Sequence, residues 1–242
     1  MPTDVRFLPA GDTAVVVEFG LDIDRAVSER VLRLSARVRE AALPGVIETV
    51  PTFRSLAIHY DPLATSGAAV AEAARLFLDD ASHVAKAQRL WRVPACYEEP
   101  YGPDLADVAE RTGLTPAEVV SLHTTTQFHV YMVGFLPGFP YMGDLPPELV
   151  LPRRTDPRVR VPAGSVAMAM AMTGVYPVES PGGWHLIGAT PIRLFDLAWE
   201  QPAQFAPGDA VRFDAITAAE YERVRAAVEH GDYALPSESL PA

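Results

Sequence analysis

Residues 128–143, FHVYMVGFLPGFPYMG, indicate how the larger part of this 242-residue chain folds. An apolar stretch that suits a strand, from Phe128 to Phe135, runs directly into a loop rich in glycine and proline. Glycine supplies positive φ and proline removes a ladder hydrogen-bond donor, so such sequence favours short strands joined by turns. Sixteen of the 23 prolines and eleven of the 16 glycines fall in residues 94–208. Many short strands with few helices predict a closed or nearly closed β-barrel.

Two helices are expected in this part of the chain because capping boxes precede apolar residues. Thr115 with Glu118, and Thr217 with Glu220, have the spacing in which the side chains of the N-cap and N3 residues cap the helix start reciprocally. The first helix places His123 near its C-terminus, and a glycine at residue 231 ends the second.

Residues 1–89 show longer periodic segments and predict a separate domain. Apolar residues recur every three or four positions from Ile23 to Val38, which is the period of one helical face. Strands are expected at 15–19, 46–50, 54–60 and 90–97, and a second helix at 68–78. This order suggests an α+β, ferredoxin-like N-terminal domain. We place the boundary near Arg89, so the domains are 1–89 and 90–242.

Composition excludes several classes of protein. The net charge of −11 opposes binding to a phosphate backbone, so nucleic acid is not an expected partner. The longest apolar run, residues 166–172, is too short to span a membrane, and residues 1–11 lack an apolar signal core. We therefore expect a cytoplasmic protein with no membrane partner. The motifs GxxxxGK[ST], GxGxxG, HExxH and GxSxG are absent from the sequence.

Metal and disulfide chemistry also lack support in the sequence. The single cysteine, Cys96, is expected to be a small buried strand residue. His, Asp and Glu do not cluster with the spacing of metal ligands, so no metal site is predicted. His123 and His129, taken singly, are more typical of structural histidines than of catalysts.

An arginine-rich segment, residues 151–164, carries four arginines and one acid inside an acidic chain. The arginines are Arg153, Arg154, Arg158 and Arg160. Guanidinium groups suit carboxylate or phosphate, so this segment predicts either an anion site or pairing with acids of this protein or a partner.

The segment ESPGGWH, residues 179–185, is a second candidate site. Gly182 and Gly183 permit a backbone nest whose N–H groups bind an oxyanion, with Trp184 as a pocket wall; the alternative is a tight hairpin with a core tryptophan. The loop 134–143 is expected to serve either as aromatic packing or as a lid. Met168, Met170 and Met172 alternate and would share one face of a strand, in the barrel core or as an exposed patch.

These segments, taken in order, resemble the allophanate hydrolase subunit 1 family. The resemblance lies in residues 123–143, 151–154, 161–166, 173–177 and 180–188. It implies a cyclophilin-like β-barrel for the C-terminal domain. It also implies a subunit, inactive alone, of an ATP-dependent 5-oxoprolinase-type amidohydrolase complex that opens 5-oxo-L-proline, or a related lactam or amide, to L-glutamate.

The resemblance further implies ATP as co-substrate, no metal in this chain, and two partners: a homologous cyclophilin-like subunit of the allophanate hydrolase subunit 2 type and a third, metal-dependent subunit. The catalytic residues that it implies are His123, Arg154 and Ser165, and the substrate- or phosphate-binding residues are Arg153, Thr173, Tyr176, Ser180, Gly182, Gly183 and Trp184.

Three positions depart from the family pattern. Met170 and Met172 replace a glycine and a glutamine, and Ala189 replaces an arginine. The changes favour a less polar pocket and hence either a different substrate or lost catalysis. A second function that the resemblance implies is a regulatory module that binds and inhibits a histidine kinase. A third, prolyl isomerisation, follows from fold analogy alone.

Overall fold

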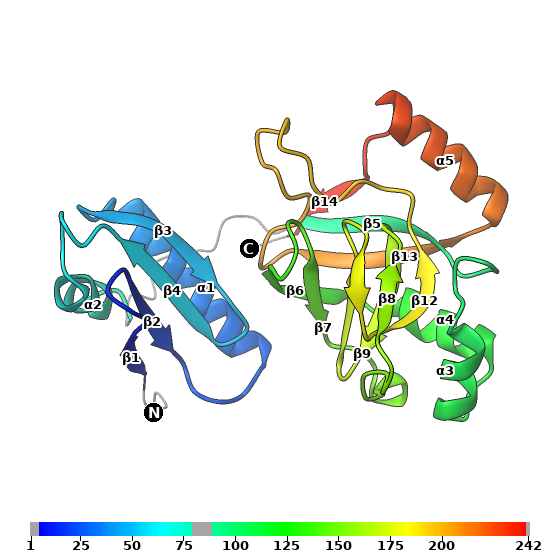
Figure 1. Ribbon diagram of the computed structural model, residues 1–242, viewed down its shortest axis with the longest axis horizontal. Helices are drawn as coiled ribbons and strands as arrows, with labels where there is room; N and C mark the ends of the chain where they lie inside the picture. Colours follow the sequence, from blue (N-terminus) through cyan, green and yellow to red (C-terminus); the bar gives the residue numbers. More distant parts are fainter. Residues whose placement is uncertain (1–4, 79–88, 241–242) are drawn as a thin grey trace. The chain divides into compact units, whose positions relative to one another are not determined.

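The computed structural model of the chain describes residues 5–78 and 89–240 (Figure 1). The backbone forms two compact units, one before Arg89 and one from Arg89 to Leu240. Each unit has its own sheet and its own hydrophobic core. Within the described residues, no helix is both long enough and apolar enough to cross a membrane.

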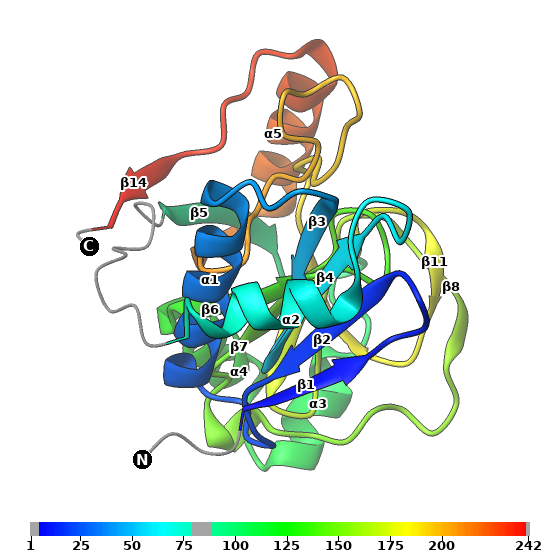
Figure 2. The same cartoon turned by 90° about the vertical axis from the view of Figure 1, so that its left-hand side faces the viewer.

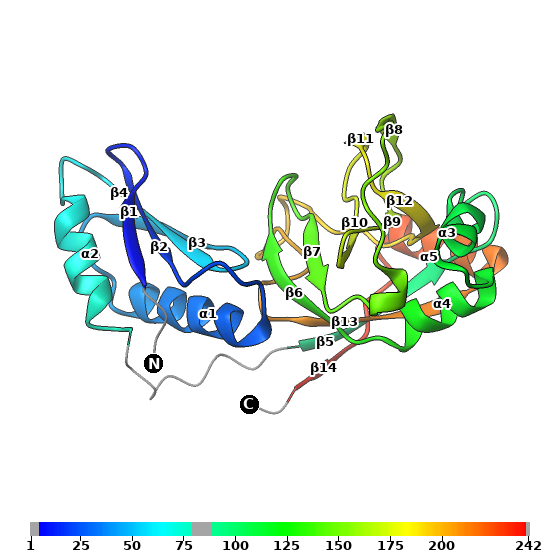
Figure 3. The ribbon, with the colours of Figure 1, turned by 90° about the horizontal axis from the view of Figure 1, so that it is seen from below.

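The N-terminal unit is a four-stranded antiparallel sheet with two helices. Its elements are β1 (Arg6–Pro9), β2 (Ala14–Glu18), α1 (Arg25–Glu40), β3 (Val46–Pro51), β4 (Ser55–Tyr60) and α2 (Gly67–Arg75). The strand order is β1-β2-β4-β3, with β1 at one edge (Figure 2). Both helices pack on one face of the sheet and share a single core with β2 and β4 (Figure 3).

Helix α1 buries the apolar face that its sequence period predicts. Val31, Leu34 and Val38 are each at most 2% exposed. The helix starts at Arg25 because the Asp24 side chain accepts a hydrogen bond from the Val27 N–H, 2.8 Å away. Ile23 therefore lies before the helix and is exposed.

The fourth strand of the ferredoxin-like sheet is β1, and not the predicted strand at residues 90–97. The strand at residues 90–97 does not join this sheet: it is β5 (Arg89–Cys96), and it pairs in the second unit. The place beside β2 is taken by β1, which reaches it through a tight turn at Gly11. A hairpin can form this pairing from neighbouring residues, and β5 is then available to the barrel.

The second unit is a barrel of seven strands with mixed directions. Its elements after β5 are α3 (Leu105–Thr112), α4 (Pro116–Thr125), β6 (Phe128–Val133), β7 (Pro140–Gly143), η1 (Pro147–Leu149), β8 (Arg158–Val161), β9 (Ser165–Ala169), β10 (Met172–Val175), β11 (Ser180–Gly182), β12 (His185–Ala189), β13 (Ala210–Ile216), α5 (Ala218–His230) and β14 (Ser237–Ser239). The ring runs β5-β12-β9-β10-β7-β6-β13, and β13 returns to β5 in parallel. The prediction of an α+β domain followed by a β-barrel domain is confirmed.

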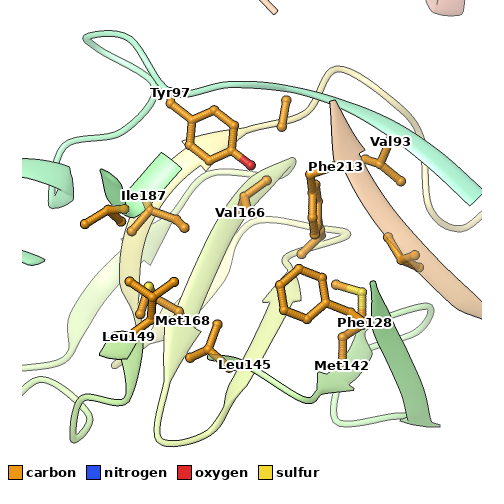
Figure 4. Packing of buried hydrophobic residues seen from close by; sticks show 14 of the residues in the cluster. Val93, Tyr97, Phe128, Met142, Leu145, Leu149, Val166, Met168, Ile187 and Phe213 are labelled. Atoms are coloured by element: carbon orange, nitrogen blue, oxygen red, sulfur yellow. The ribbon is translucent and has the colours of Figure 1, made fainter. Parts of the chain in front are cut away.

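Alternation along β9 separates two apolar clusters. Val166 and Met168 belong to the barrel core, where Phe128, Phe213 and Met142 also pack (Figure 4). Ala167 and Ala169 belong to a second cluster that contains four aromatic rings. Successive side chains of a strand point to opposite faces, so the second cluster lies on the other side of β9 from the barrel core.

The predicted caps and the cysteine are found where expected. Thr115 with Glu118, and Thr217 with Glu220, form complete capping boxes at α4 and α5. Cys96 is fully buried in β5.

The three alternating methionines do not share a face, so that prediction is wrong. The chain reverses direction between β9 and β10, where Ala169 pairs with Met172. Met168 is therefore fully buried in the barrel core, Met170 is 57% exposed at the turn, and Met172 packs against the second cluster. No exposed methionine stripe is formed by these three residues.

Replacing Met170 by glycine is expected to stabilise the barrel by about 0.5–1 kcal/mol. Met170 has φ 55°, a conformation that costs a residue with a Cβ about 1–2 kcal/mol and costs glycine very little. The greater freedom of glycine in the unfolded chain offsets part of this gain. Urea unfolding of Met170→Gly and the parent chain measures the difference, and a lower midpoint for the variant would contradict the role assigned to the turn.

Candidate functional site

His123 is held in a buried chain of hydrogen bonds. Its Nδ1 lies 2.8 Å from the Tyr97 hydroxyl and its Nε2 lies 2.9 Å from the Thr173 hydroxyl. The Thr173 hydroxyl donates in turn to the Ala167 carbonyl oxygen, 3.0 Å away. Because this donation leaves Thr173 as the acceptor, Nε2 carries the proton and Nδ1 accepts from Tyr97.

Burial keeps His123 neutral. The side chain is 0% exposed, and burial lowers its pKa to about 3. Burial also raises the pKa of Tyr97 well above its ordinary value. The His123 ring packs against Phe128 and Phe213 at centroid distances of 5.0 and 4.6 Å. His123 and Thr173 are thus brought together as predicted, within the barrel core and away from solvent.

The imidazole of His123 is expected to keep its Nε2–H tautomer from pH 8 to pH 5, because its pKa of about 3 lies below that range. The unfolded chain binds a proton at an ordinary histidine pKa, so this group stabilises the fold fully above about pH 6.5 and progressively less as the pH falls toward 3. Two-dimensional 15N NMR of the imidazole tests this directly, and a shift that titrates near pH 6.5 would contradict it.

Three arginines of the arginine-rich segment pair with acids of this chain. Arg160 forms an exposed pair with Glu179 at 2.6 Å. Arg154 and Arg158 both bind Asp104, at 3.1 and 2.7 Å. Of the two alternatives given for the arginine-rich segment, an anion site or pairing with acids, these three side chains follow the second.

Asp104 is a site residue that the sequence analysis missed. Its carboxylate accepts hydrogen bonds from Arg154, from both terminal nitrogens of Arg158 and from the backbone N–H of Leu186. Burial by itself would raise the pKa of Asp104, but these hydrogen bonds and the two positive charges outweigh it and hold the pKa below its ordinary value. Asp104 therefore fixes the arginine-rich segment against the start of β12.

Arg153 differs from its three neighbours. It is exposed and, in the part of the chain that the structure describes, forms no ion pair. Burial raises the pKa of Tyr141 and of Tyr176, and the positive charge of Arg153 opposes this shift at both phenols. The positive charge of this unpaired cation therefore acts on one half-buried tyrosine, Tyr141, and one buried tyrosine, Tyr176.

These tyrosines belong to an aromatic cluster that we define as Phe139, Tyr141, Tyr176 and Trp184. The Phe139 ring centroid lies 4.9 Å from Tyr141, 5.2 Å from Tyr176 and 5.7 Å from Trp184. The residues come from β7 and its preceding loop, from the position directly after β10 and from the position directly before β12. This aromatic cluster is therefore the place where three predicted segments meet: 134–143, 173–177 and 180–188. Met172 also packs against it.

The glycine pair does not form the predicted anion nest. Neither Gly182 nor Gly183 has a positive φ, which a nest requires at one of two successive residues. Gly182 instead makes room for Tyr176, because a Cβ at Gly182 would lie 2.3 Å from the Tyr176 hydroxyl oxygen. Similarly, a Cβ at Gly174 would lie 2.8 Å from Phe139. Both glycines allow close packing of the aromatic cluster.

The remaining predicted residues are buried inside the second unit. The Ser165 hydroxyl donates to the Pro162 carbonyl at 2.8 Å. Ser180 Oγ is buried without a hydrogen-bond partner among the described residues. Trp184 is 7% exposed, and Ala189 lies buried in β12. Among residues 5–78 and 89–240, no three His, Cys, Asp or Glu side chains gather in a way that would hold a metal ion.

The missed residues left little signal in the sequence. Asp104 stands 50 and 54 positions before its arginine partners, and Tyr97 stands 26 before His123. Only the closure of the barrel brings these positions together.

Comparisons with known proteins agree with this architecture. Residues 5–205 match the family described as carboxyltransferase domain, subdomain C and D. The B subunit of 5-oxoprolinase from Bacillus subtilis (strain 168) is 37% identical over 222 residues, which cover 87% of this chain and 92% of that protein. The B subunit of 5-oxoprolinase from Escherichia coli O157:H7 is 39% identical over 203 residues, which cover 84% and 92%.

A solved structure shares the fold at lower identity. The urea carboxylase of Kluyveromyces lactis superposes with a TM-score of 0.79 and 20% identity over 98% of this chain and 24% of that one. With the family match over most of its length, the chain belongs to the carboxyltransferase domain, subdomain C and D family.

Proposed function

We propose that this chain acts as the B-type subunit of an ATP-dependent 5-oxoprolinase complex. The observation that carries the proposal is the similarity to two bacterial 5-oxoprolinase B subunits, at 37% and 39% identity over more than four fifths of the chain. The aromatic cluster with Arg153 beside it supports the proposal, because the motif segments meet there.

The proposed reaction opens the lactam of 5-oxo-L-proline, or of a related amide. One ATP and two water molecules are consumed, and L-glutamate, ADP and phosphate are formed. A lactam is a poor electrophile, so transfer of a phosphoryl group to its oxygen creates an imidate-like species that water attacks. Cationic donors stabilise the substrate carboxylate or the transferred phosphate in such chemistry.

Arg153 is the residue of this chain that we assign to anion binding. Its guanidinium is exposed and unpaired among the described residues, whereas Arg154 and Arg158 share the carboxylate of Asp104 and Arg160 pairs with Glu179. We assign Tyr176, Gly182 and Trp184 to the wall beside it. His123, Thr173, Ser165 and Arg154 then support this wall, with their hydrogen bonds directed into the protein. ATP is a co-substrate of the complex.

The proposal is tested first by affinity capture of the tagged chain from its native cell. We expect a homologous cyclophilin-like subunit and a third, metal-dependent subunit to co-purify, and the captured material to release ADP when 5-oxoproline is added. Capture of a histidine kinase without either subunit would contradict the proposal and favour the regulatory function. The feature that favoured that function in the sequence, a shared methionine face, is not formed.

A further inference from the structure

Phe135 combines two features that are unfavourable for the folded chain. Its side chain is 67% exposed, and its backbone has φ 70°. The strain is imposed by a short loop, in which the Gly134 N–H donates to the Phe139 carbonyl and the Phe139 N–H donates to the Leu136 carbonyl, each at 3.0 Å. A bulky side chain in the left-handed region is rare, and glycine would adopt it without strain.

Packing among residues 5–78 and 89–240 does not explain the aromatic ring at this position. Phe135 makes an edge-to-face contact with Phe139 at a centroid distance of 5.9 Å and otherwise leaves most of its surface in solvent. Residues held in strained conformations gather at functional sites, where the surrounding structure maintains them. An observed backbone outlier that also exposes a large aromatic group therefore points to a binding role.

The position of Phe135 specifies that role. Phe139, which Phe135 contacts, is the central ring of the aromatic cluster, and Arg153 acts electrostatically on Tyr141 and Tyr176 of the same cluster. The Arg154 N–H donates to the Gly183 carbonyl at 2.8 Å, so Arg153 stands next in sequence to a residue that is hydrogen-bonded beside Trp184. One exposed apolar group and one exposed cation thus adjoin the same aromatic cluster, in which Phe139, Tyr176 and Trp184 are themselves buried. A small cyclic amide with a carboxylate has the matching chemistry, an apolar ring face and one negative charge.

We propose that Phe135 is a substrate-contact residue whose ring covers the apolar face of the cyclic amide while Arg153 binds its carboxylate. This inference rests on the proposed function and adds a residue that contacts the ring of the substrate. Contact with one aromatic face is worth about a tenfold change in affinity. The contact exists in both the bound and the transition state, so it should act on KM more than on kcat.

The test is the steady-state kinetics of Phe135→Gly in the reconstituted complex, with 5-oxoproline as the varied substrate. We expect KM to rise about tenfold with kcat changed less than about threefold. The melting temperature should be equal to or above that of the parent, because glycine removes the strain at φ 70°. A purely structural residue would instead lose stability. Phe135→Tyr keeps the ring and should keep the parent KM.

Met170→Gly is the matched control. The sequence suggested a pocket position for Met170, but the structure places it at the exposed β9–β10 turn and outside the aromatic cluster. The exchange of this exposed, positive-φ residue for glycine should therefore leave KM at the parent value. An unchanged KM for Phe135→Gly in an active complex would overturn the inference and leave the proposed function intact. Loss of subunit assembly by Phe135→Gly would also overturn it, because Phe135 would then be a docking residue. A parent complex without 5-oxoproline turnover would overturn the proposed function itself.

Discussion

Replacing Arg153 by alanine is expected to lower kcat/KM for 5-oxoproline about a hundredfold in the assembled complex. Hydrogen bonds to a charged group contribute about 1.5–3 kcal/mol, and about 1.4 kcal/mol corresponds to a factor of ten. Arg153 is exposed and has no acid partner among the described residues, so the substitution removes little from the folded chain. The melting temperature should therefore stay close to that of the parent.

The matched control for Arg153 is Arg160→Ala in the same segment. Arg160 is also exposed, but Glu179 neutralises it. This variant should retain the parent kcat/KM within a factor of about two, because an exposed ion pair contributes little. Arg153→Lys should recover part of the activity, since a lysine restores the charge without the planar fork. Equal activity of Arg153→Ala and Arg160→Ala would contradict the assignment of the anion-binding residue.

Replacing Asp104 by alanine is expected to destabilise the barrel by about 2–4 kcal/mol. The carboxylate is buried, with 6% of the side chain exposed, and it accepts hydrogen bonds from two arginines and one backbone N–H. Its removal leaves two partly buried cations without a partner. The arginine side chains are 28% and 25% exposed, so water compensates part of the loss and keeps the effect below that of a fully buried pair.

The pH dependence of unfolding provides a second test of Asp104. The pKa of Asp104 is lowered in the folded state, so its contribution to stability is complete above the unfolded pKa near 3.8 and is lost as the pH falls through the folded value. Asp104→Asn should therefore flatten the pH dependence of the unfolding free energy below about pH 4. The control Glu179→Ala removes an exposed partner and should cost under about 1 kcal/mol. Equal losses for Asp104→Ala and Glu179→Ala would contradict the role of Asp104.

Local sequence signals predict much of the fold. The capping boxes at Thr115 and Thr217 fix helix starts through contacts three residues apart, and both are confirmed. The strand expected at residues 90–97 is confirmed in extent, but it pairs in the second sheet and not in the first. Its partners are β13 and β12, more than 90 residues further along the chain, and sequence periodicity does not encode which distant strand pairs with which.

In the candidate site, too, local features can be predicted from the sequence and long-range contacts cannot. The sequence locates the arginine-rich segment and the aromatic motifs, whose composition is unusual for this acidic chain. It does not separate Arg153 from Arg154 and Arg158, because the acid that pairs with the latter two lies 50 and 54 residues away. It also predicts a glycine nest where close packing against Tyr176 is the reason for glycine. Which cation stays unpaired is decided by tertiary structure.

The most direct test of the proposed function is 5-oxoproline-dependent formation of L-glutamate and ADP by the partner subunits, measured with and without this chain. We predict equal amounts of glutamate and ADP when the chain is present and none when it is omitted. Turnover at the same rate without the chain, or no turnover with the fully assembled complex, would contradict the assignment of this chain to a 5-oxoprolinase complex.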